Sequence, residues 1–486
     1  MLIKRDWFQL NSKAICSLRM SRVWRSLVMG CLVLTLGMLW GLARQAAGLP
    51  EVPPTHAAVT QFSLMPANYA SNFMDDSAGQ ERVSARAPIS FTAAFTLYLP
   101  IIFKPIANLK SLVTESTVTL PHPLADASFS WCTWGWCSIS PRLYQEPIGD
   151  GRTFIGWTDS SGDGHVSILS TTGSLTQTFD FSAQVLRGLT VHDDGSFAVL
   201  LWDPNAKRMW LSSRNANGTE IWKTDITGSL TVFDPGIGDS RLAYGNNLYA
   251  AYFAVYGISG WVQGHNGDQL TYVSSSGSPQ SGGWDWGCSH SMAELINYHP
   301  ALNKFLPICS SDCYDSKGIL LNDSQVVYAS DGNCGGNVSA QLGQAAQSDS
   351  SWKLVFNAMS QPCCDGRGIG LATINGTNQS SYLWLTDTSG ANERDPVIAR
   401  LGSTLQTDRY VVGWTTTNDG VYWLAVITGS GTYLMGPEEV SSSGVAWGNR
   451  DDSFRTRADG SVSWVQGDPG STTLHFFHFD GSAYLP

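Results

Sequence analysis

The pattern of apolar and polar positions divides the chain into regions of different character. Residues 26–43, SLVMGCLVLTLGMLWGLA, form an apolar run of 18 residues without a charge. From about residue 125 to the end, short apolar runs are interrupted by Gly, Asn or Asp every eight to twelve residues. Short, evenly spaced runs of this kind predict strands joined by turns, and helical periodicity is almost absent. We therefore predict an all-β domain over residues 124–486.

A repeated phrase runs through this β-rich region. SFAVLLWDPNAKRMWLSSRNANGTEIWKT, from Ser196, can be set over LYAAYFAVYGISGWVQGHNGDQLTYVSS, from Leu248, so that apolar runs, polar turn and Asn-Gly hairpin coincide. The tetrapeptide WVQG occurs at both Trp261 and Trp464. Aligned copies follow one another at intervals of 41 to 75 residues, with anchor positions at Phe154, Phe197, Tyr249, Glu294, Ile369, Tyr410 and Val462.

Each copy divides into four short strands. The second gives GLTVHD, SFAVLLWD, KRMWLSSR and TEIWKTD. Four-stranded units of about 40 to 50 residues, stacked around a central channel, are typical of a β-propeller. We predict a seven-bladed β-propeller of four-stranded blades. Residues Ala125 to Gln145 are expected to supply the innermost strand of the first blade and to contribute to closing the ring.

Two short phrases resemble known groups of proteins. NANGTEIWKTD, from Asn215, resembles the blade sequence of quinoprotein-type propellers, and the resemblance implies the fold rather than a chemistry. FTLYLPIIFKP, residues 95–105, resembles a tract near the start of many exported proteins of filamentous, Chloroflexus-like bacteria. Taken by itself, the second phrase predicts a strand that packs on the all-β domain that follows it in the sequence.

The N-terminal region predicts export. Residues 1–48 hold seven basic side chains and one acidic side chain, and small residues follow the apolar run. This layout is typical of a signal peptide, although the run is long enough to remain as a membrane anchor. Residues 49–123 hold nine of the 21 prolines, so we expect a linker or stalk there. The protein is expected to be secreted or extracytoplasmic, with membrane contact only through residues 26–43.

The charge balance argues against one class of partner. Residues 49–486 carry 22 basic and 39 acidic side chains, a net charge of −17. Because proteins bind a phosphate backbone through clustered Lys and Arg, and no such cluster follows the N-terminal region, we expect no nucleic-acid partner. The expected partners are a glycan or a cell-surface protein.

Cysteine number predicts disulfides. Eight cysteines follow the apolar run, an even number in a chain expected to be exported. Loop placement and proximity along the chain suggest the pairs Cys288 with Cys334, Cys132 with Cys137, and Cys309 with Cys313. Cys363 and Cys364 are adjacent, and their partners stay open.

The segment GWDWGCSHS, from Gly283, is the candidate ligand site. In the predicted ring it connects the third blade to the innermost strand of the fourth. Four of its side chains are therefore expected at the channel mouth: Trp284, Asp285, Trp286 and His290. Ligand pockets typically combine apolar walls with a few polar groups. Tryptophans in β-rich chains also pack between blades, and that purely structural interpretation stays open.

Other loops are expected on the same face as this segment. They are Thr158 to Gly164, Asp203 to Lys207, His299 to Asn303, and Thr415 to Gly420. A glycoside hydrolase or lyase needs two carboxylates about 5 to 9 Å apart across a pocket. The aspartates that would converge there if the blades fall as predicted are Asp163, Asp203, Asp285 and Asp419.

Calcium is the one cofactor that a motif suggests. Asp159, Ser161 and Asp163 in DSSGDG present alternate oxygen donors like the first half of a calcium loop, but Ser170 stands where the final acid would be. Polar Asp-Gly hairpins also form without an ion. TTNDGVYW, from Thr416, resembles the Asp box of sialidase-like propellers. The alternative of a zinc site, for which disulfides compete, would use Cys288, His290, His299, Cys309 and Cys313.

Two classes of function follow. The first is a binding or scaffolding module beyond a stalk, whose aromatic-rich face contacts a glycan, a polymer or a protein. The second is an extracellular enzyme on the same face, either a glycoside hydrolase or lyase, or a quinone-dependent dehydrogenase. The dehydrogenase is what NANGTEIWKTD and the Cys363–Cys364 pair imply by resemblance. No G-x-S-x-G motif indicates a serine hydrolase. The sequence favours the binding module.

Overall fold

The described part of the chain begins after the predicted signal segment and most of the predicted linker. The computed structural model describes residues 108–485 except 126–127, 133–134, 140–141, 236–237, 289–292, 312–317, 330–339, 360–366, 377–379, 387–392, 417–419 and 449–452. These residues belong to the compact unit Leu99–Pro486. Among them, no helix is both long enough and apolar enough to cross a membrane.

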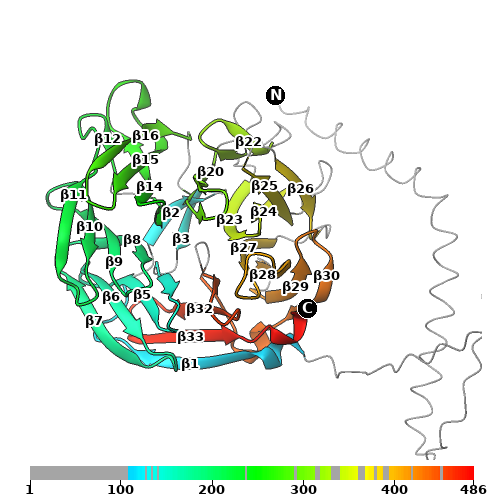
Figure 1. Cartoon of the computed structure of the whole chain (residues 1–486). Helices are drawn as coiled ribbons and strands as arrows, with labels where there is room; N and C mark the ends of the chain where they lie inside the picture. The colour runs from blue at the N-terminus through cyan, green and yellow to red at the C-terminus, as the bar shows by residue number, and fades with distance from the viewer. Residues whose placement is uncertain are drawn as a thin grey trace, which may run out of the picture. The chain divides into compact units, whose positions relative to one another are not determined.

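Seven antiparallel sheets form a ring, which confirms the predicted seven-bladed β-propeller (Figure 1). In each sheet one strand lines the central channel and three more follow outward. In that order the first three blades are β4 (Tyr144–Pro147), β5 (Thr153–Thr158), β6 (Gly164–Leu169), β7 (Leu175–Phe181); β8 (Val185–Val191), β9 (Phe197–Asp203), β10 (Arg208–Arg214), β11 (Glu220–Asp225); and β13 (Ser240–Gly245), β14 (Leu248–Gly257), β15 (Asn266–Ser274), β16 (Pro279–Gly287).

The last four blades follow the same plan. They are β17 (Glu294–Leu295), β20 (Ile308–Ser310), β21 (Ile319–Leu321), β22 (Gln325–Tyr328); β23 (Ala340–Gln347), β24 (Ser351–Met359), β25 (Arg367–Asn375), β26 (Ser380–Trp384); β27 (Glu393–Arg400), β28 (Arg409–Thr416), β29 (Tyr422–Thr428), β30 (Tyr433–Glu439); and β31 (Arg455–Thr456), β32 (Val462–Gly467), β33 (Thr473–Phe479), with β1 (Val113–Thr119) as the outermost strand.

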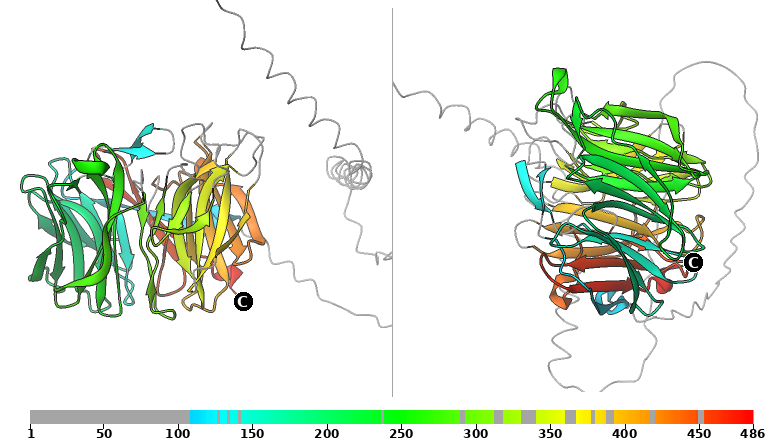
Figure 2. Two further views of the ribbon diagram at one scale, coloured as in Figure 1. Left: turned by 90° about the horizontal axis from the view of Figure 1, so that it is seen from above. Right: turned by 90° about the vertical axis from the view of Figure 1, so that its left-hand side faces the viewer.

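Short additional elements decorate the ring. A hairpin of β2 (Ser128–Cys132) and β3 (Gly135–Ile139) stands out from one face of the disc (Figure 2). The others are β12 (Phe233–Asp234), which pairs with β14, the hairpin of β18 (Tyr298–His299) and β19 (Lys304–Phe305), and the 3₁₀ turns η1 (Leu109–Leu112), η2 (Gly260–Val262), η4 (Ser441–Ser443) and η5 (Ser482–Tyr484).

The position of a strand within its blade explains its sequence. β9 reads FAVLLWD and is buried along nearly its whole length, because a middle strand packs against a neighbouring blade on each side. β11, the outermost strand of the same blade, reads EIWKTD and is largely exposed. Continuous apolar runs therefore mark the middle strands, and mixed runs mark the rim.

Aromatic side chains fill the spaces between blades. The largest fully buried side chains include Trp157, Trp352, Trp414, Trp447 and Trp464. Trp352 packs in a core shared by the fourth and fifth blades, and Trp414 packs in a core shared by the fifth and sixth. In the outermost strand of the second blade, Trp222 donates its Nε1–H to the carbonyl of Ser275 in the third blade, at 2.9 Å. Packing between blades thus accounts for many of the tryptophans, as the structural interpretation of the sequence expected.

Two of the seven anchor positions are out of phase with the others. Phe154, Phe197 and Tyr249 lie on the second strands of their blades, but Glu294 lies on the innermost strand β17 and Ile369 on the third strand β25. The prediction that the His299 to Asn303 loop shares a face with the loops at 158–164 and 203–207 is therefore wrong. This loop lies between the first and second strands, whereas the other two connect second and third strands.

The ring is closed by a strand from the region predicted as linker. β1 pairs with β33 in antiparallel register from Val113 opposite Phe479 to Thr119 opposite Thr473. Of the segment Ala125 to Gln145, only its last residues enter the innermost strand β4, and much of the rest forms the β2–β3 hairpin. The closing strand therefore precedes the segment to which the sequence analysis assigned it.

Removing β1 should open the ring. We expect a chain that lacks residues 1–120 to melt at least about 5 °C below the full chain, because β33 would become an unpaired edge. A chain that lacks residues 1–107 keeps β1 and should melt like the full chain. Thermal unfolding followed by circular dichroism makes the comparison, and equal melting temperatures for the two truncations would contradict closure by β1.

Candidate functional site

The GWDWGCSHS segment lies at the rim of the third blade, not at the channel mouth where the sequence analysis placed it. Trp284, Asp285 and Trp286 belong to β16, the outermost strand. The physical reason is that WVQG at Trp261 forms the 3₁₀ turn η2 rather than the third strand. NGDQLTYVS is therefore the third strand, β15, and the segment after it becomes the outermost strand, β16. His290, the fourth predicted residue, lies outside the described residues.

A β-bulge sends the two tryptophans to opposite sides of the blade. Asp268 of β15 pairs with Gly287 of β16, and Leu270 pairs with Trp284. The interval on β16 is therefore one residue longer than the interval on β15, which is a β-bulge. Trp284 consequently packs in a core shared with the fourth blade, and Trp286 packs in a core shared with the second. The structure therefore does not bring these two predicted ligand residues into one site.

Trp284 helps to enclose a buried carboxyl group. Its Nε1–H donates to Asp268 Oδ1 at 2.7 Å, and the hydroxyl of Tyr252 donates to Asp268 Oδ2 at 2.7 Å. Burial raises the pKa of Asp268 to about 7, although both hydrogen bonds favour the ionised form. Asp268 was not predicted as a site residue. The only sign of it in the sequence is an acidic residue within the apolar strand NGDQLTYVS.

A disulfide between Cys288 and Cys309 joins the end of the third blade to the fourth. The expected pairs Cys288 with Cys334 and Cys309 with Cys313 are therefore wrong. Cys309 lies on β20, and its Cα is 6.4 Å from that of Cys288, within the range that a disulfide spans. The remaining predicted pair, Cys132 with Cys137, involves side chains outside the described residues, and so do the other cysteines, Cys313, Cys334, Cys363 and Cys364.

The predicted zinc ligands do not assemble among the described residues. The Asp268 carboxylate and the sulfur atoms of Cys288 and Cys309 lie within 4.8 Å of one another, but the two sulfurs are bonded together. His299 is bonded through Nε2 to the carbonyl of Ser348 at 2.9 Å. His290 and Cys313 lie outside the described residues. A disulfide has no thiolate to offer to a metal, so this arrangement does not support the zinc alternative.

Trp286 adjoins an exposed aromatic surface on the third blade. Trp261 is 81% exposed, and its ring meets that of Trp286 edge-on with centroids 6.0 Å apart. Tyr256, near the end of β14, is 37% exposed, and Ile258, in the loop that carries Trp261, is 43% exposed. We call these four residues, Tyr256, Ile258, Trp261 and Trp286, the Trp261 platform. The second WVQG copy has the opposite environment, because Trp464 lies in β32 and is 0% exposed.

The base of the Trp261 platform is fixed by stacking and by backbone hydrogen bonds. Trp286 stacks on Phe233 at 5.3 Å. The N–H of Gly264 donates to the carbonyl of Gly257 at 2.9 Å, and the N–H of Ile258 donates to the carbonyl of Val232 at 2.8 Å. These contacts hold Trp261 outward on a folded loop. Asp285 is exposed on the neighbouring strand β16.

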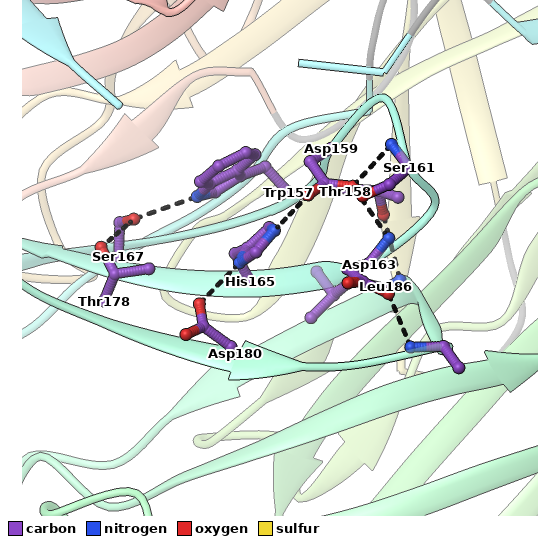
Figure 3. Close-up of polar contacts among 11 residues, drawn as sticks. Trp157, Thr158, Asp159, Ser161, Asp163, His165, Ser167, Thr178, Asp180 and Leu186 are labelled. Atoms are coloured by element: carbon purple, nitrogen blue, oxygen red, sulfur yellow. Dashed lines mark hydrogen bonds and ion pairs between the residues drawn. The ribbon is translucent and has the colours of Figure 1, made fainter. Parts of the chain in front are cut away.

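The loop predicted to bind calcium uses its oxygen atoms for its own turn (Figure 3). Asp159 Oδ1 accepts hydrogen bonds from the backbone N–H of Ser161 and of Asp163, both at 2.9 Å, and from the Ser161 hydroxyl at 2.7 Å. Asp163 Oδ1 accepts the N–H of Ala183 at 2.6 Å. An ion would have to displace these donors, so the geometry does not fit the predicted calcium site at Asp159, Ser161 and Asp163.

His165 connects this loop to the rest of the first blade. Its Nε2 lies 3.1 Å from Asp159 Oδ2, and its Nδ1 lies 2.8 Å from Asp180 Oδ1 (Figure 3). Burial works against the ionised form of Asp159, but the hydrogen bonds outweigh burial and lower its pKa to about 2. The rings of Trp157 and His122 stack with that of His165. This group ties the segment that follows β1 to the first blade.

The aspartates proposed for an enzyme are not brought together among the described residues. Asp163 is engaged as above, and Asp203 Oδ1 accepts the N–H groups of Asn205 and Ala206 in its own turn at 3.0 and 2.9 Å. Asp285 stands on the rim strand β16. Asp419 lies outside the described residues. A pair of facing carboxylates is therefore not formed by Asp163, Asp203 and Asp285.

A cavity that the sequence analysis did not identify lies on the ring axis. Its volume is about 430 Å³, and innermost strands and adjoining turns of all seven blades line it. The lining includes Glu146, Gln347, Arg400 and Arg455, but not Trp284, Asp285 or Trp286. No sequence motif predicts this cavity, because each blade contributes only a few residues to it.

Comparisons with known proteins show no family for this chain. No family model matches the chain, and no curated protein matches it. Among solved structures, an oligogalacturonate lyase in complex with manganese is similar at 10% identity and a TM-score of 0.42, over 76% of this chain and 98% of that one. The α-L-arabinanase of Penicillium chrysogenum is 8% identical with a TM-score of 0.40, over 74% and 98%.

A third similar structure is the WD40 domain of Toxoplasma gondii coronin, at 10% identity and a TM-score of 0.38, over 75% of this chain and 86% of that one. Likenesses at this level carry no conclusion about function, because one fold hosts many functions. The quinoprotein-like and Chloroflexus-like resemblances stay predictions.

Asp268 should make stability fall as pH rises. Its pKa is raised from 3.8 to about 7, so the folded state holds a proton that the unfolded chain releases. The stabilisation is complete below about pH 4 and is lost by about pH 7, at no more than about 1.4 kcal/mol per pH unit. Asp268→Asn should abolish this slope in urea unfolding, and Asp285→Asn, an exposed control on the adjacent strand, should keep it. Parallel curves for the wild type and Asp268→Asn would refute the assignment.

The disulfide should stabilise the junction of the third and fourth blades. Its cysteines are 21 residues apart, so closing that loop in the unfolded chain is worth about 3 kcal/mol. The double variant Cys288→Ser/Cys309→Ser should lose this amount of unfolding free energy under oxidising conditions. A reductant should destabilise the wild type more than the double variant, which controls for the other cysteines. An equal effect on both proteins would show that the bond contributes nothing.

Proposed function

We propose that this protein is an exported binding module that holds a glycan on the Trp261 platform. The observation that supports this proposal is the 81% exposure of the Trp261 side chain beside Trp286. Burying the apolar surface of an exposed tryptophan ring is favourable. A ligand that covers the ring therefore gains binding free energy from that burial. The apolar C–H face of a sugar ring is a flat surface of that kind.

The contacts of the loop order the Trp261 platform in advance, which favours ligand binding. Stacking of Trp286 on Phe233 and the backbone hydrogen bonds of Gly264 and Ile258 fix the platform before a ligand arrives. A site that is already ordered loses less conformational entropy on binding. Asp285 on β16 is an exposed hydrogen-bond acceptor close in sequence to Trp286, and a sugar hydroxyl is a matching donor.

Export is the part of the proposal that comes from the sequence. The charged lead, the apolar run of residues 26–43 and the proline-rich segment predict delivery across a membrane, and glycans and cell-surface proteins are encountered there. A cell-surface protein is the second candidate partner, since exposed aromatic side chains also anchor protein interfaces. An enzyme on this fold remains the alternative function, for which the carboxylates named above supply no facing pair.

Glycan binding should depend on Trp261. Purified full chain, Trp261→Ala and a matched control, Tyr382→Ala, should be compared on a glycan array and by calorimetry with the best array ligand. Tyr382 is an aromatic side chain that is 46% exposed on a different blade. We expect Trp261→Ala to weaken binding at least about tenfold, close to the 1.4 kcal/mol that a good aromatic contact provides. The control should bind like the wild type.

The outcomes separate the candidate partners. Glycan binding that Trp261→Ala leaves unchanged would remove the platform from the proposal. Failure of the wild type on all glycans, combined with capture of one cell-surface protein that Trp261→Ala abolishes, would replace the glycan with a protein ligand. Because Trp261 is exposed, its replacement should not alter the melting temperature, and this measurement serves as the folding control.

A further inference from the structure

The axial cavity is open toward one face of the ring. The parts of the innermost strands that line it are those next to the turn into the second strand, as in Glu146 to Gly149 in and after β4 and Arg455 to Ala458 in and after β31. Its volume of about 430 Å³ lies within the range of pockets that hold small molecules. The Trp261 platform is on another part of the molecule, because Trp261 itself lies in the loop between the second and third strands of the third blade.

The charged residues lining the cavity are mostly arginines. The described lining residues include three arginines, Arg400, Arg455 and Arg457, and one carboxylate, that of Glu146. Arg455 Nη2 lies 2.8 Å from Glu146 Oε1, which forms an ion pair. Arg457 donates to Thr153 Oγ1 and to the carbonyl of Gly151 at 2.9 and 2.8 Å. The cavity wall therefore carries excess positive charge.

Arg400 is the cation in this wall with the weakest contacts. Its Nε and Nη1 each donate to a backbone carbonyl, of Gly402 and of Gln347, and both distances are 3.4 Å. No described carboxylate lies within ion-pair distance of its guanidinium. Burial lowers the pKa of Arg400, which shows that its surroundings oppose the charge. A guanidinium held this way lacks the counter-charge that usually accompanies burial.

More arginines lie along the same channel beyond the cavity. Arg187 lies on the innermost strand β8, where its Nη2 donates to the carbonyl of Gly238 at 2.6 Å, and Arg241 lies on the innermost strand β13. Arg142 reaches Asp239 in the third blade, with Nη2 3.4 Å from Oδ1. With Glu294 on β17, the described charges of this group are three arginines and two carboxylates: Arg142, Arg187, Arg241, Asp239 and Glu294.

The cavity wall thus has a sign opposite to that of the chain. The chain carries a net charge of −11, whereas the described residues that line the cavity include three arginines and one carboxylate. A low-dielectric cleft lined by one sign of charge concentrates ions of the other sign. We propose that the axial cavity binds a small oxyanion, up to an acidic sugar in size, with Arg400 as its principal contact. The planar guanidinium donates pairs of hydrogen bonds that match a carboxylate, sulfate or phosphate group.

Titration of the full chain tests this proposal. The probes are sodium glucuronate, sulfate and phosphate, with glucose as the neutral counterpart of glucuronate and chloride to keep ionic strength constant. We expect calorimetry to detect at least one oxyanion and a rise in melting temperature with its concentration, because the ligand stabilises only the folded state. Glucose should have no effect. Arg400→Gln should weaken oxyanion binding at least about tenfold.

Matched variants make the result specific. Arg394→Gln changes an exposed arginine on the same strand, β27, and should bind like the wild type. Arg400→Lys keeps the charge but loses the two-pronged donor, so it should give intermediate affinity, and it replaces Arg400→Gln as the test if the latter does not fold. Trp261→Ala should leave oxyanion binding unchanged, so this proposal and the glycan platform can fail independently.

Each outcome has one meaning. Binding of glucuronate alone identifies an acidic sugar as the source of the anion, and comparable binding of sulfate or phosphate identifies a free inorganic oxyanion. Either supports the proposal when Arg400→Gln weakens it. Equal binding of glucose and glucuronate, no response of the wild type to any oxyanion, or unchanged binding in a folded Arg400 variant would overturn it.

Discussion

The pairing of β1 with β33 is the contact on which the rest of the structure depends. A blade buries its two faces only against its neighbours, so an open ring would expose one face of the first blade and one of the last. β1 supplies the outermost strand of the last blade, and the chain after it carries Leu120 and Leu124 into the core between the last and first blades. A segment at the start of the described chain thus completes a sheet built from its last strands. Closure also fixes the ring axis, and with it the cavity.

Closure sets the chemistry of the axis as well. The innermost strands have one free edge, so their polar groups find partners across blade boundaries. Gln344 in the fifth blade accepts the N–H of Phe454 from the last blade at 3.2 Å, and Gln145 in the first blade donates to Ser463 Oγ at 2.5 Å. Buried amide and hydroxyl groups of this kind cost free energy unless they are paired. The polar wall of the cavity is therefore a consequence of closing the sheets in a circle.

Periodic features of the fold could be predicted from the sequence, and local departures from the period could not. Burial on both faces of middle strands produces apolar runs such as FAVLLWD, and these gave the number of blades correctly. WVQG shows the limit, because Trp464 is buried in a strand while Trp261 stands exposed in a turn. The bulge in β16 depends on pairing with β15, which the sequence of β16 alone does not specify. The Cys288–Cys309 bond and the axial cavity depend on contacts between blades, which carry no motif.

The two proposed sites follow from different physical causes. Trp261 projects because a turn, fixed by its own backbone bonds, holds an aromatic ring away from any blade, so its exposure is local and its replacement should cost the fold little. Arg400 lies where several blades meet, and its guanidinium contacts the backbone of two of them. Its charge is tolerated there because the closed ring holds carbonyl groups toward it. An anion bound to Arg400 in the cavity would therefore stabilise the junction of the blades as well as occupy the site.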